Sequence, residues 1–272
     1  MKRLKIGIVG CGAIGSSLAK TIVKNFKEEA ELVALFDIDT KKSRSLSKIV
    51  SKDDLAVSGL RQLISKSKLV IEASSAATSW QISRNVLTGG CDIMLMSVGG
   101  IVSHFRKLSV LAKKYNANVY IPSGAISGVD ALKAARIGKI RRVILTTLKN
   151  PVSFRGVSYV DHLGIRLDKL KKDKVLFSGP AKDALKYFPQ NINVSAVLSM
   201  AGIGAKKTKV KIIASPKTKK NIHEIQIDSN VAKIFTRTEN ILHPDNPKTS
   251  YLAVLSAIAT LKQILGPIKI GT

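Results

Sequence analysis

The sequence lacks several features, and each absence excludes a class of protein. Its 272 residues include only two cysteines, Cys11 and Cys91, which excludes a disulfide framework. No run of 18 or more apolar residues occurs, so we expect no transmembrane helix. The N-terminus lacks the long apolar core and the small-residue cleavage site of a signal peptide. With 45% hydrophobic residues, the composition predicts a globular protein, and the scarcity of cysteine fits a reducing cytoplasm.

Acidic and aromatic residues are also scarce. Asp and Glu total 18 against 45 Lys and Arg, a formal net charge of +27. Such a charge indicates nucleic acid or an anionic membrane as a partner, but it also suits an enzyme of anionic substrates. A surface for single-stranded nucleic acid needs aromatics among its basic residues, whereas aromatics make up 5% here. We therefore expect a solvated basic surface that binds neither nucleic acid nor membrane.

The first half of the chain alternates short apolar segments with amphipathic ones. The expected strands are residues 4–9, 32–37, 69–71, 93–96 and 118–121. The expected helices are residues 13–25, 41–49, 60–64, 79–87 and 105–114. Strands that alternate with helices on short connections are typical of a parallel, doubly wound α/β sheet. The pattern predicts a Rossmann dinucleotide-binding domain over residues 1–122, completed by residues 246–272.

The pattern changes after Pro122. The expected strands are now residues 142–147, 174–177, 207–214, 222–228 and 232–238, with helices at 129–136, 181–187, 194–200 and 249–265. Several strands alternate in polarity, as a half-exposed sheet does. We expect an α+β substrate and dimerisation domain with an open-faced mixed sheet over residues 123–245. Because the open face needs a cover, we also expect a homodimer.

A glycine-rich turn follows the first expected strand. Gly10-Cys11-Gly12-Ala13-Ile14-Gly15 is a G-x-G-x-x-G between a strand and a helix, the context that makes this pattern a dinucleotide fingerprint. Gly10 permits the tight turn, Gly12 lets backbone N–H groups approach a pyrophosphate, and Gly15 lets the helix pack closely. The helix that starts at Ala13 and Ile14 adds partial positive charge. Cys11 is interpreted as a small filler beside the cofactor and not as a nucleophile.

An acidic residue ends the second expected strand. Asp37 lies 22 residues after Gly15, where the acid that bonds the adenosine ribose is expected. A carboxylate repels a 2′-phosphate, which favours NAD. Lys41, Lys42 and Arg44 follow closely and offer a place for such a phosphate, so NADP stays an alternative.

Four segments of the second half combine Gly, Pro, Asn or Ser with the start of an expected helix or strand. They are residues 121–128 (IPSGAISG), 188–195 (FPQNINVS), 221–224 (NIHE) and 246–250 (NPKTS). Such backbone-shaping loops are where sites are built. Together with the fingerprint and residues 96–100 (MSVGG), they resemble the L-aspartate dehydrogenase family over essentially the whole chain. The chain departs mildly at Gly100, where the family more often has Ala, and at His243, which many members lack.

The resemblance implies an activity and two kinds of site residue. The family oxidises L-aspartate with NAD or NADP to iminoaspartate, which hydrolyses to oxaloacetate and ammonia or feeds NAD biosynthesis. By motif, His223 is the acid/base, and Ala125 with Asn191 or Asn193 contacts the cofactor near the nicotinamide. No metal is implied.

The chemistry of amine oxidation agrees with a histidine at position 223. Hydride transfer needs a deprotonated amine and hydrolysis needs a base for water, and a histidine with a pKa near neutrality can serve both. We expect His104 and His162 at the surface, and His243 near the active site without being the base.

A dicarboxylate substrate needs Lys or Arg side chains and helix N-termini. Lys248, Thr249 and Ser250 are expected to open the last helix, where backbone N–H groups and hydroxyls suit an anion. Alternatively, Thr249 or Ser250 only caps that helix. The sequence leaves open which Lys or Arg binds the second carboxylate.

Two other functions stay open at this point. One is another two-domain dehydrogenase or reductase of aspartate-derived metabolites, such as homoserine dehydrogenase or dihydrodipicolinate reductase; the latter usually has a His-His-x-x-Lys run that this chain lacks. The other is a non-enzymatic, NAD-sensing protein that binds nucleic acid.

Overall fold

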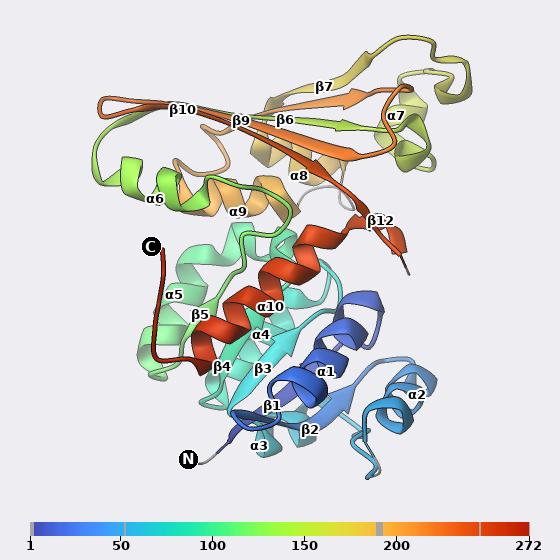
Figure 1. Cartoon of the computed structure of the whole chain (residues 1–272). Helices are drawn as coiled ribbons and strands as arrows, with labels where there is room; N and C mark the ends of the chain where they lie inside the picture. The colour runs from blue at the N-terminus through green and yellow to red at the C-terminus, as the bar shows by residue number, and fades with distance from the viewer. Residues whose placement is uncertain (1–2, 52, 189–192, 245, 272) are drawn as a thin grey trace. The chain divides into compact units, whose positions relative to one another are not determined.

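The computed structural model describes residues 3–51, 53–188, 193–244 and 246–271 (Figure 1). The chain divides into two compact units. Unit 1 comprises Met1–Pro122 and Val254–Ile270, and unit 2 comprises Ser123–Ala253 and Gly271–Thr272. Among the described residues, no helix has both the length and the apolar character needed to cross a membrane.

Unit 1 is built on a five-stranded parallel sheet. Its strands are β1 (Leu4–Val9), β2 (Ala30–Phe36), β3 (Leu69–Glu72), β4 (Asp92–Leu95) and β5 (Val119–Tyr120), in the order β2-β1-β3-β4-β5. All four residues of β3 and the last four of β1 are buried. A parallel sheet covered on both faces requires such continuous burial, which is why these strands appear in the sequence as apolar runs.

Helices connect these strands. They are α1 (Ala13–Asn25), α2 (Thr40–Val50), α3 (Leu60–Lys66), α4 (Ser79–Thr88), the 3-10 helix η1 (Val98–His104) and α5 (Phe105–Lys114). The helix α10 (Tyr251–Leu265) returns to this unit from the far end of the sequence. Its Ala257 and Leu261 are buried in one cluster with Leu18 and Ile22 of α1.

Unit 2 contains a five-stranded mixed sheet. Its strands are β6 (Ile140–Lys149), β7 (Lys174–Pro180), β8 (Lys209–Ala214), β9 (Asn221–Ser229) and β10 (Lys233–Asn240), in the order β10-β9-β6-β8-β7. Strands β6 and β8 run parallel, and the other neighbours are antiparallel. Two short strands, β11 (Leu242–His243) and β12 (Asn246–Ser250), form a separate pair.

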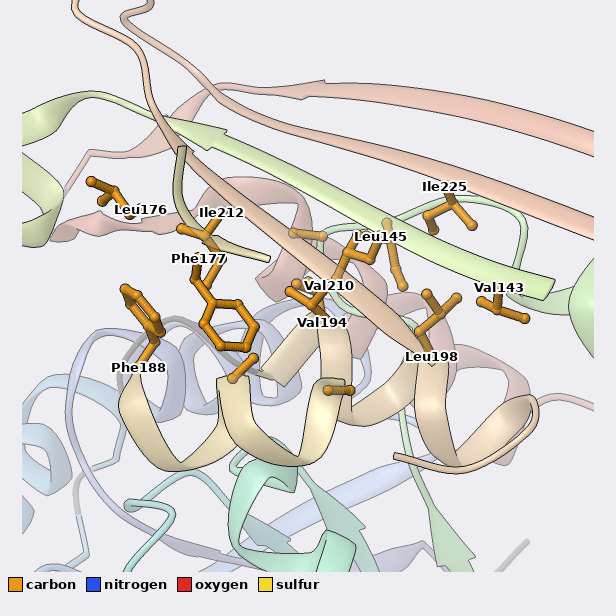
Figure 2. Close-up of a cluster of buried hydrophobic side chains, with 14 of the residues drawn as sticks. Val143, Leu145, Leu176, Phe177, Phe188, Val194, Leu198, Val210, Ile212 and Ile225 are labelled. Atoms are coloured by element: carbon orange, nitrogen blue, oxygen red, sulfur yellow. The ribbon is translucent and has the colours of Figure 1, made fainter. Parts of the chain in front are cut away.

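One face of this mixed sheet carries the apolar core of unit 2. Figure 2 shows Leu145 and Val210 of the sheet beside Val194 and Leu198 of a covering helix. The helical segments of the unit are α6 (Val129–Ile137), η2 (Pro151–Phe154), α7 (Ser158–His162), η3 (Leu167–Lys169), α8 (Ala181–Tyr187) and α9 (Asn193–Ala201). On the opposite face the alternate side chains of β10 are exposed, Phe235 at 61%. The predicted fold class, a Rossmann domain plus an α+β domain with an open-faced mixed sheet, is confirmed.

The start of the last helix differs from the prediction. Lys248, Thr249 and Ser250 belong to strand β12, and the helix begins at Tyr251. Pairing of Leu242 with Ser250 in the β11–β12 ladder explains the difference, because an extended residue cannot form part of the first helical turn. Ser250 directly precedes Tyr251, which is the position of a helix cap. The expectation that these three residues form the first turn is therefore wrong.

Candidate active site

The fingerprint turn leads from β1 into α1. Gly10 has φ +92°, a conformation that glycine adopts readily, and a Cβ there would collide with the carbonyl of Ala73. A Cβ on Gly15 would collide with the carbonyl of Gly10. A Cβ on Gly12, by contrast, would have no heavy atom within 4 Å. The turn therefore leaves room beside Gly12, at the N-terminus of α1 where Ala13 and Ile14 begin the helix.

Asp37 follows β2 and is tied to this turn. Its carboxylate accepts hydrogen bonds from the backbone N–H of Cys11 at 2.7 Å and of Asp39 at 2.9 Å. Burial, and then the negative charge of Asp37, raise the pKa of the Cys11 thiol to about 12. A thiol with so high a pKa is not a thiolate at neutral pH, which agrees with its interpretation as a filler and not a nucleophile.

A cavity of about 270 Å³ lies between α1 and α2 beside this turn. Its lining includes three lysines, two serines, Cys11 and two apolar side chains: Lys20, Lys41, Lys42, Ser16, Ser45, Leu46 and Ile49. Lys42 also lies 3.9 Å from the carboxylate of Asp39. The cavity combines cations and hydroxyls, which are the groups that bind phosphate.

In unit 2, the buried face of the mixed sheet changes from apolar to polar along its strands. On β6 the buried positions run from Val143 and Leu145 to Thr147 and Lys149. On β9, which is antiparallel to β6, they run from Ile227 and Ile225 to His223 and Asn221. Because side chains two residues apart share a face, the four polar side chains gather at one end of the core.

His223 lies in this polar group. The residue is 3% exposed, and its Nδ1 lies 3.0 Å from the Oγ1 of Thr147, its partner across the β6–β9 ladder. Burial, and then the charge of Lys149, lower the pKa of His223 to about 3. The expected pKa near neutrality is therefore wrong for this environment: the imidazole is neutral over the whole physiological range.

Two buried asparagines connect the segments that the sequence singled out. The Nδ2 of Asn221 donates to the Oγ of Ser250 at 3.1 Å. The Nδ2 of Asn240 donates to the backbone carbonyls of Ala125 at 3.0 Å and of Asn221 at 3.1 Å. The Oδ1 of Asn240 is buried and has no hydrogen-bond partner among the described residues. Three predicted segments thus meet at one place, with an unsatisfied acceptor among them.

Sequence reasoning missed Lys149 and Asn240. Lys149 is 6% exposed, and burial lowers its pKa to about 8. The available signal was the alternation along β6, which places residue 149 on the buried face. Among 45 basic residues, that signal alone does not distinguish Lys149. Asn240 ends β10 in the same way, as the one buried residue of a strand whose other residues alternate between exposed and half-buried.

The remaining predicted residues are placed as follows. Asn193 is exposed at the start of α9, and Asn191 lies outside the described residues. The Oγ1 of Thr249 accepts a hydrogen bond from the Nδ2 of Asn246 at 3.1 Å, and Lys248 contributes backbone to β12. No group of three or more His, Cys, Asp or Glu side chains that could hold a metal ion occurs in the part of the chain that the structure describes.

The other three histidines differ from His223 in their surroundings. His243 is 2% exposed, and its ring meets that of Tyr251 edge-on with centroids 5.3 Å apart. The ring of His104 stacks on Trp80 at 4.4 Å. The Nδ1 of His162 lies 2.6 Å from the carbonyl of Ser158, within the short helix α7.

Two protein families match the chain, one in each half. The family described as "Aspartate dehydrogenase, C-terminal" matches residues 130–264. The family described as "Homoserine dehydrogenase, NAD binding domain" matches residues 10–122, the region of the fingerprint turn.

Known proteins resemble the chain over its full length. An L-aspartate dehydrogenase of Methanosarcina mazei is 44% identical over 99% of this chain and 100% of its own. Another, of Methanococcus maripaludis, is 40% identical with the same coverage. The crystal structure of an aspartate dehydrogenase from Thermotoga maritima superposes with a TM-score of 0.73 at 27% identity, covering 99% of this chain and 100% of that one. A homoserine dehydrogenase from Thiobacillus denitrificans shares the fold alone. It superposes with a TM-score of 0.63 at 13% identity, covering 97% of this chain and 74% of that one.

Proposed function

Because the chain belongs to the L-aspartate dehydrogenase family and is a dehydrogenase with a nicotinamide-cofactor domain, we propose that it oxidises L-aspartate. In the proposed reaction, a hydride leaves Cα of the substrate for the oxidised nicotinamide ring, and the amine becomes an imine. Iminoaspartate, the reduced cofactor and a proton are the products. Water then hydrolyses the imine to oxaloacetate and ammonia, unless a following enzyme takes iminoaspartate for NAD biosynthesis.

The observation that carries this proposal is the buried, neutral His223 in the polar end of the unit 2 core. A neutral imidazole has a nitrogen free to accept the proton that the substrate ammonium must lose before its hydride is transferred. With a pKa of about 3 it is a weak base before substrate binds, and the negative charge of the carboxylates of bound L-aspartate would raise that pKa towards the range that proton transfer needs. If Nδ1 carries the imidazole hydrogen and donates it to the Oγ1 of Thr147, Nε2 is the free acceptor. His223 can then return that proton, or take one from the water that attacks the imine.

The fingerprint turn is the proposed site of the cofactor pyrophosphate. The open space beside Gly12 and the backbone of Gly10, Ala13, Ile14 and Gly15 fit an anion at the start of α1. Ala125 and one residue of the pair Asn191 and Asn193 are proposed to contact the nicotinamide end.

NAD is the proposed preferred cofactor, and NADP a second one. The carboxylate of Asp37 is held by two backbone N–H groups beside the fingerprint turn. In this proposal it accepts the ribose hydroxyls, and its charge disfavours a 2′-phosphate. The neighbouring cavity contains Lys20, Lys41 and Lys42, which supply positive charge for that phosphate.

The open face of the mixed sheet is the proposed dimer contact. Val175 is 44% exposed and Phe235 61%, and Leu148 and Ile213 on the same face are half-buried. A second copy of the chain would remove this apolar surface from water. Light scattering after size exclusion tests the dimer. We also propose a cytoplasmic location, since both cysteines are free thiols.

A substrate panel tests the activity. The purified protein is supplied with L-aspartate, L-glutamate, L-asparagine, L-alanine or L-homoserine, each with NAD or NADP, while absorbance of the reduced nicotinamide is followed. We expect L-aspartate to be oxidised faster than any other amino acid of the panel, with one ammonia released for each reduced nicotinamide formed. Preferential oxidation of L-homoserine would instead support the homoserine dehydrogenase alternative, and no turnover with any amino acid would refute the proposed function.

A further inference from the structure

Lys149 is the last residue of β6, and the chain on both sides of it is fixed. Its backbone carbonyl accepts a hydrogen bond from the N–H of Ser215 at 2.8 Å. The next residue, Asn150, donates from Nδ2 to the carbonyl of Thr218 at 3.0 Å and accepts at Oδ1 from the N–H of Val152 at 3.2 Å. These hydrogen bonds fix the backbone at Lys149, and with it the position of the Lys149 Cβ.

The side chain of Lys149 lies on the same face as His223. Thr147, two residues earlier on β6, pairs with His223, and Leu148 pairs with Ile222. Lys149 and Asn221 are the next residues on the two strands. Both side chains are buried on this face, and the positive charge of Lys149 contributes to the lowered pKa of His223.

A lysine is costly at a site that is only 6% exposed. Desolvation disfavours its ammonium form and lowers its pKa to about 8. A cation at such a place is typical of a functional site, where a bound anion offsets the desolvation when the site is occupied.

Polar groups around Lys149 and His223 suit a small polar anion. Asn221, Asn240 and Ser250 supply amide and hydroxyl groups, and each is at most 6% exposed. The Oδ1 of Asn240 has no partner among the described residues, although it is buried. A ligand with a hydrogen-bond donor would satisfy this atom, and a carboxylate on the same ligand is a group that a lysine ammonium attracts.

We propose that the Lys149 ammonium binds one of the two substrate carboxylates and thereby holds the reacting Cα next to His223. This inference rests on the proposed function, because it takes the substrate to be a dicarboxylic amino acid. Of the 45 Lys and Arg residues in the chain, Lys149 is the one proposed to bind this carboxylate. An ammonium–carboxylate contact in a buried site is direct and charge-assisted, so its loss acts mainly on substrate binding.

Lys149→Met tests the proposal, with Lys211→Met as a matched control. Methionine keeps the length of the side chain and removes its charge. Lys211 is an exposed lysine on the neighbouring strand β8, where it pairs with Thr146. Binding of the reduced cofactor by Lys149→Met shows that this variant is folded. If Lys149→Met does not bind the reduced cofactor, Lys149→Gln is used instead.

The first measurement is calorimetric titration with succinate, a dicarboxylate without an amine. We expect Lys149→Met to weaken succinate binding about 10- to 100-fold, the loss typical of a hydrogen bond to a charged group. Lys211→Met should stay within about twofold of the wild type, and Lys149→Arg should retain part of the affinity because it keeps the cation.

The second measurement is steady-state kinetics. The KM for L-aspartate should rise by a similar factor in Lys149→Met, with a smaller change in kcat. L-asparagine lacks the β-carboxylate of L-aspartate, and L-isoasparagine lacks the α-carboxylate. Comparing the two identifies the carboxylate that Lys149 binds, because the KM for the analogue without that carboxylate should change little in Lys149→Met.

The outcomes separate this proposal from the proposed function. If the wild type oxidises L-aspartate but Lys149→Met binds succinate and L-aspartate within about twofold of the wild type, Lys149 does not bind a carboxylate, and the function stands. A fall in kcat with unchanged KM and unchanged succinate binding would equally overturn the assignment of Lys149 as the carboxylate ligand. If the wild type oxidises no dicarboxylic amino acid yet binds succinate through Lys149, the proposed function fails and the carboxylate site remains.

Discussion

The two units build their candidate sites from different parts of the chain. In unit 1 the site is made by backbone: a turn of glycines, the start of a helix, and one carboxylate held by two N–H groups. In unit 2 it is made by side chains that alternate along two strands and become buried only when those strands pair. The comparison teaches that a backbone site depends on a few neighbouring residues, whereas a side-chain site depends on register.

The largest effect should come from breaking the unit 1 site alone. In Gly12→Val the new side chain occupies the open space beside the turn, so it should prevent the pyrophosphate from reaching the backbone. Gly12 has an ordinary φ of −75°, so the fold should survive. We expect no measurable NADH binding in a fluorescence titration and little change in the thermal unfolding midpoint. Normal NADH affinity would refute the fingerprint assignment.

Breaking the unit 2 site should leave the cofactor in place. His223→Ala removes the proposed acid/base, and general acid–base catalysis contributes about 10²–10⁴ in rate. We expect kcat for L-aspartate to fall by about that factor while NADH binds nearly as well.

His243→Ala is the matched control for this variant, because His243 is also a buried histidine of unit 2. It should lower kcat far less than His223→Ala does. If His243→Ala is the inactive enzyme and His223→Ala is normal, the acid/base belongs beside residues 246–250.

A smaller effect is expected for cofactor choice. Asp37→Ser removes the charge that disfavours a 2′-phosphate and leaves Lys41 and Lys42 beside the cavity. The ratio of kcat/KM with NADP to that with NAD should rise by about tenfold, since a close charge contact contributes about 1.4 kcal/mol or more. An unchanged ratio would show that Asp37 does not contact the ribose.

The last expected effect concerns stability against acid and not activity. The pKa of His223 is lowered to about 3 from its ordinary value of 6.5, so the unfolded chain binds this proton more readily than the folded chain does. The free energy of unfolding should therefore fall as the pH drops from about 6.5 towards 3. Denaturant unfolding of His223→Gln should show a shallower decline than the wild type over that range, and parallel curves would contradict the buried, neutral imidazole.

The fold class could be predicted because both sheets leave a local signal. Continuous apolar runs indicated the strands of unit 1, and alternation indicated those of unit 2. The short pair β11–β12 left no such signal, since residues 246–250 contain a proline and precede a helix directly. Its pairing with Leu242 and His243 is a tertiary fact, and it displaced the predicted helix start.

The sequence by itself determined the fingerprint turn, the two-unit order of elements and the family, because each depends on residues that are neighbours in the chain or on motifs that can be compared one by one. The protonation of His223 and the burial of Lys149 were decided only by the tertiary structure. A pKa depends on how much water and which charges surround a group. Those surroundings come from β6, β9 and the helices that cover them, which lie far apart in sequence and meet only in the folded sheet.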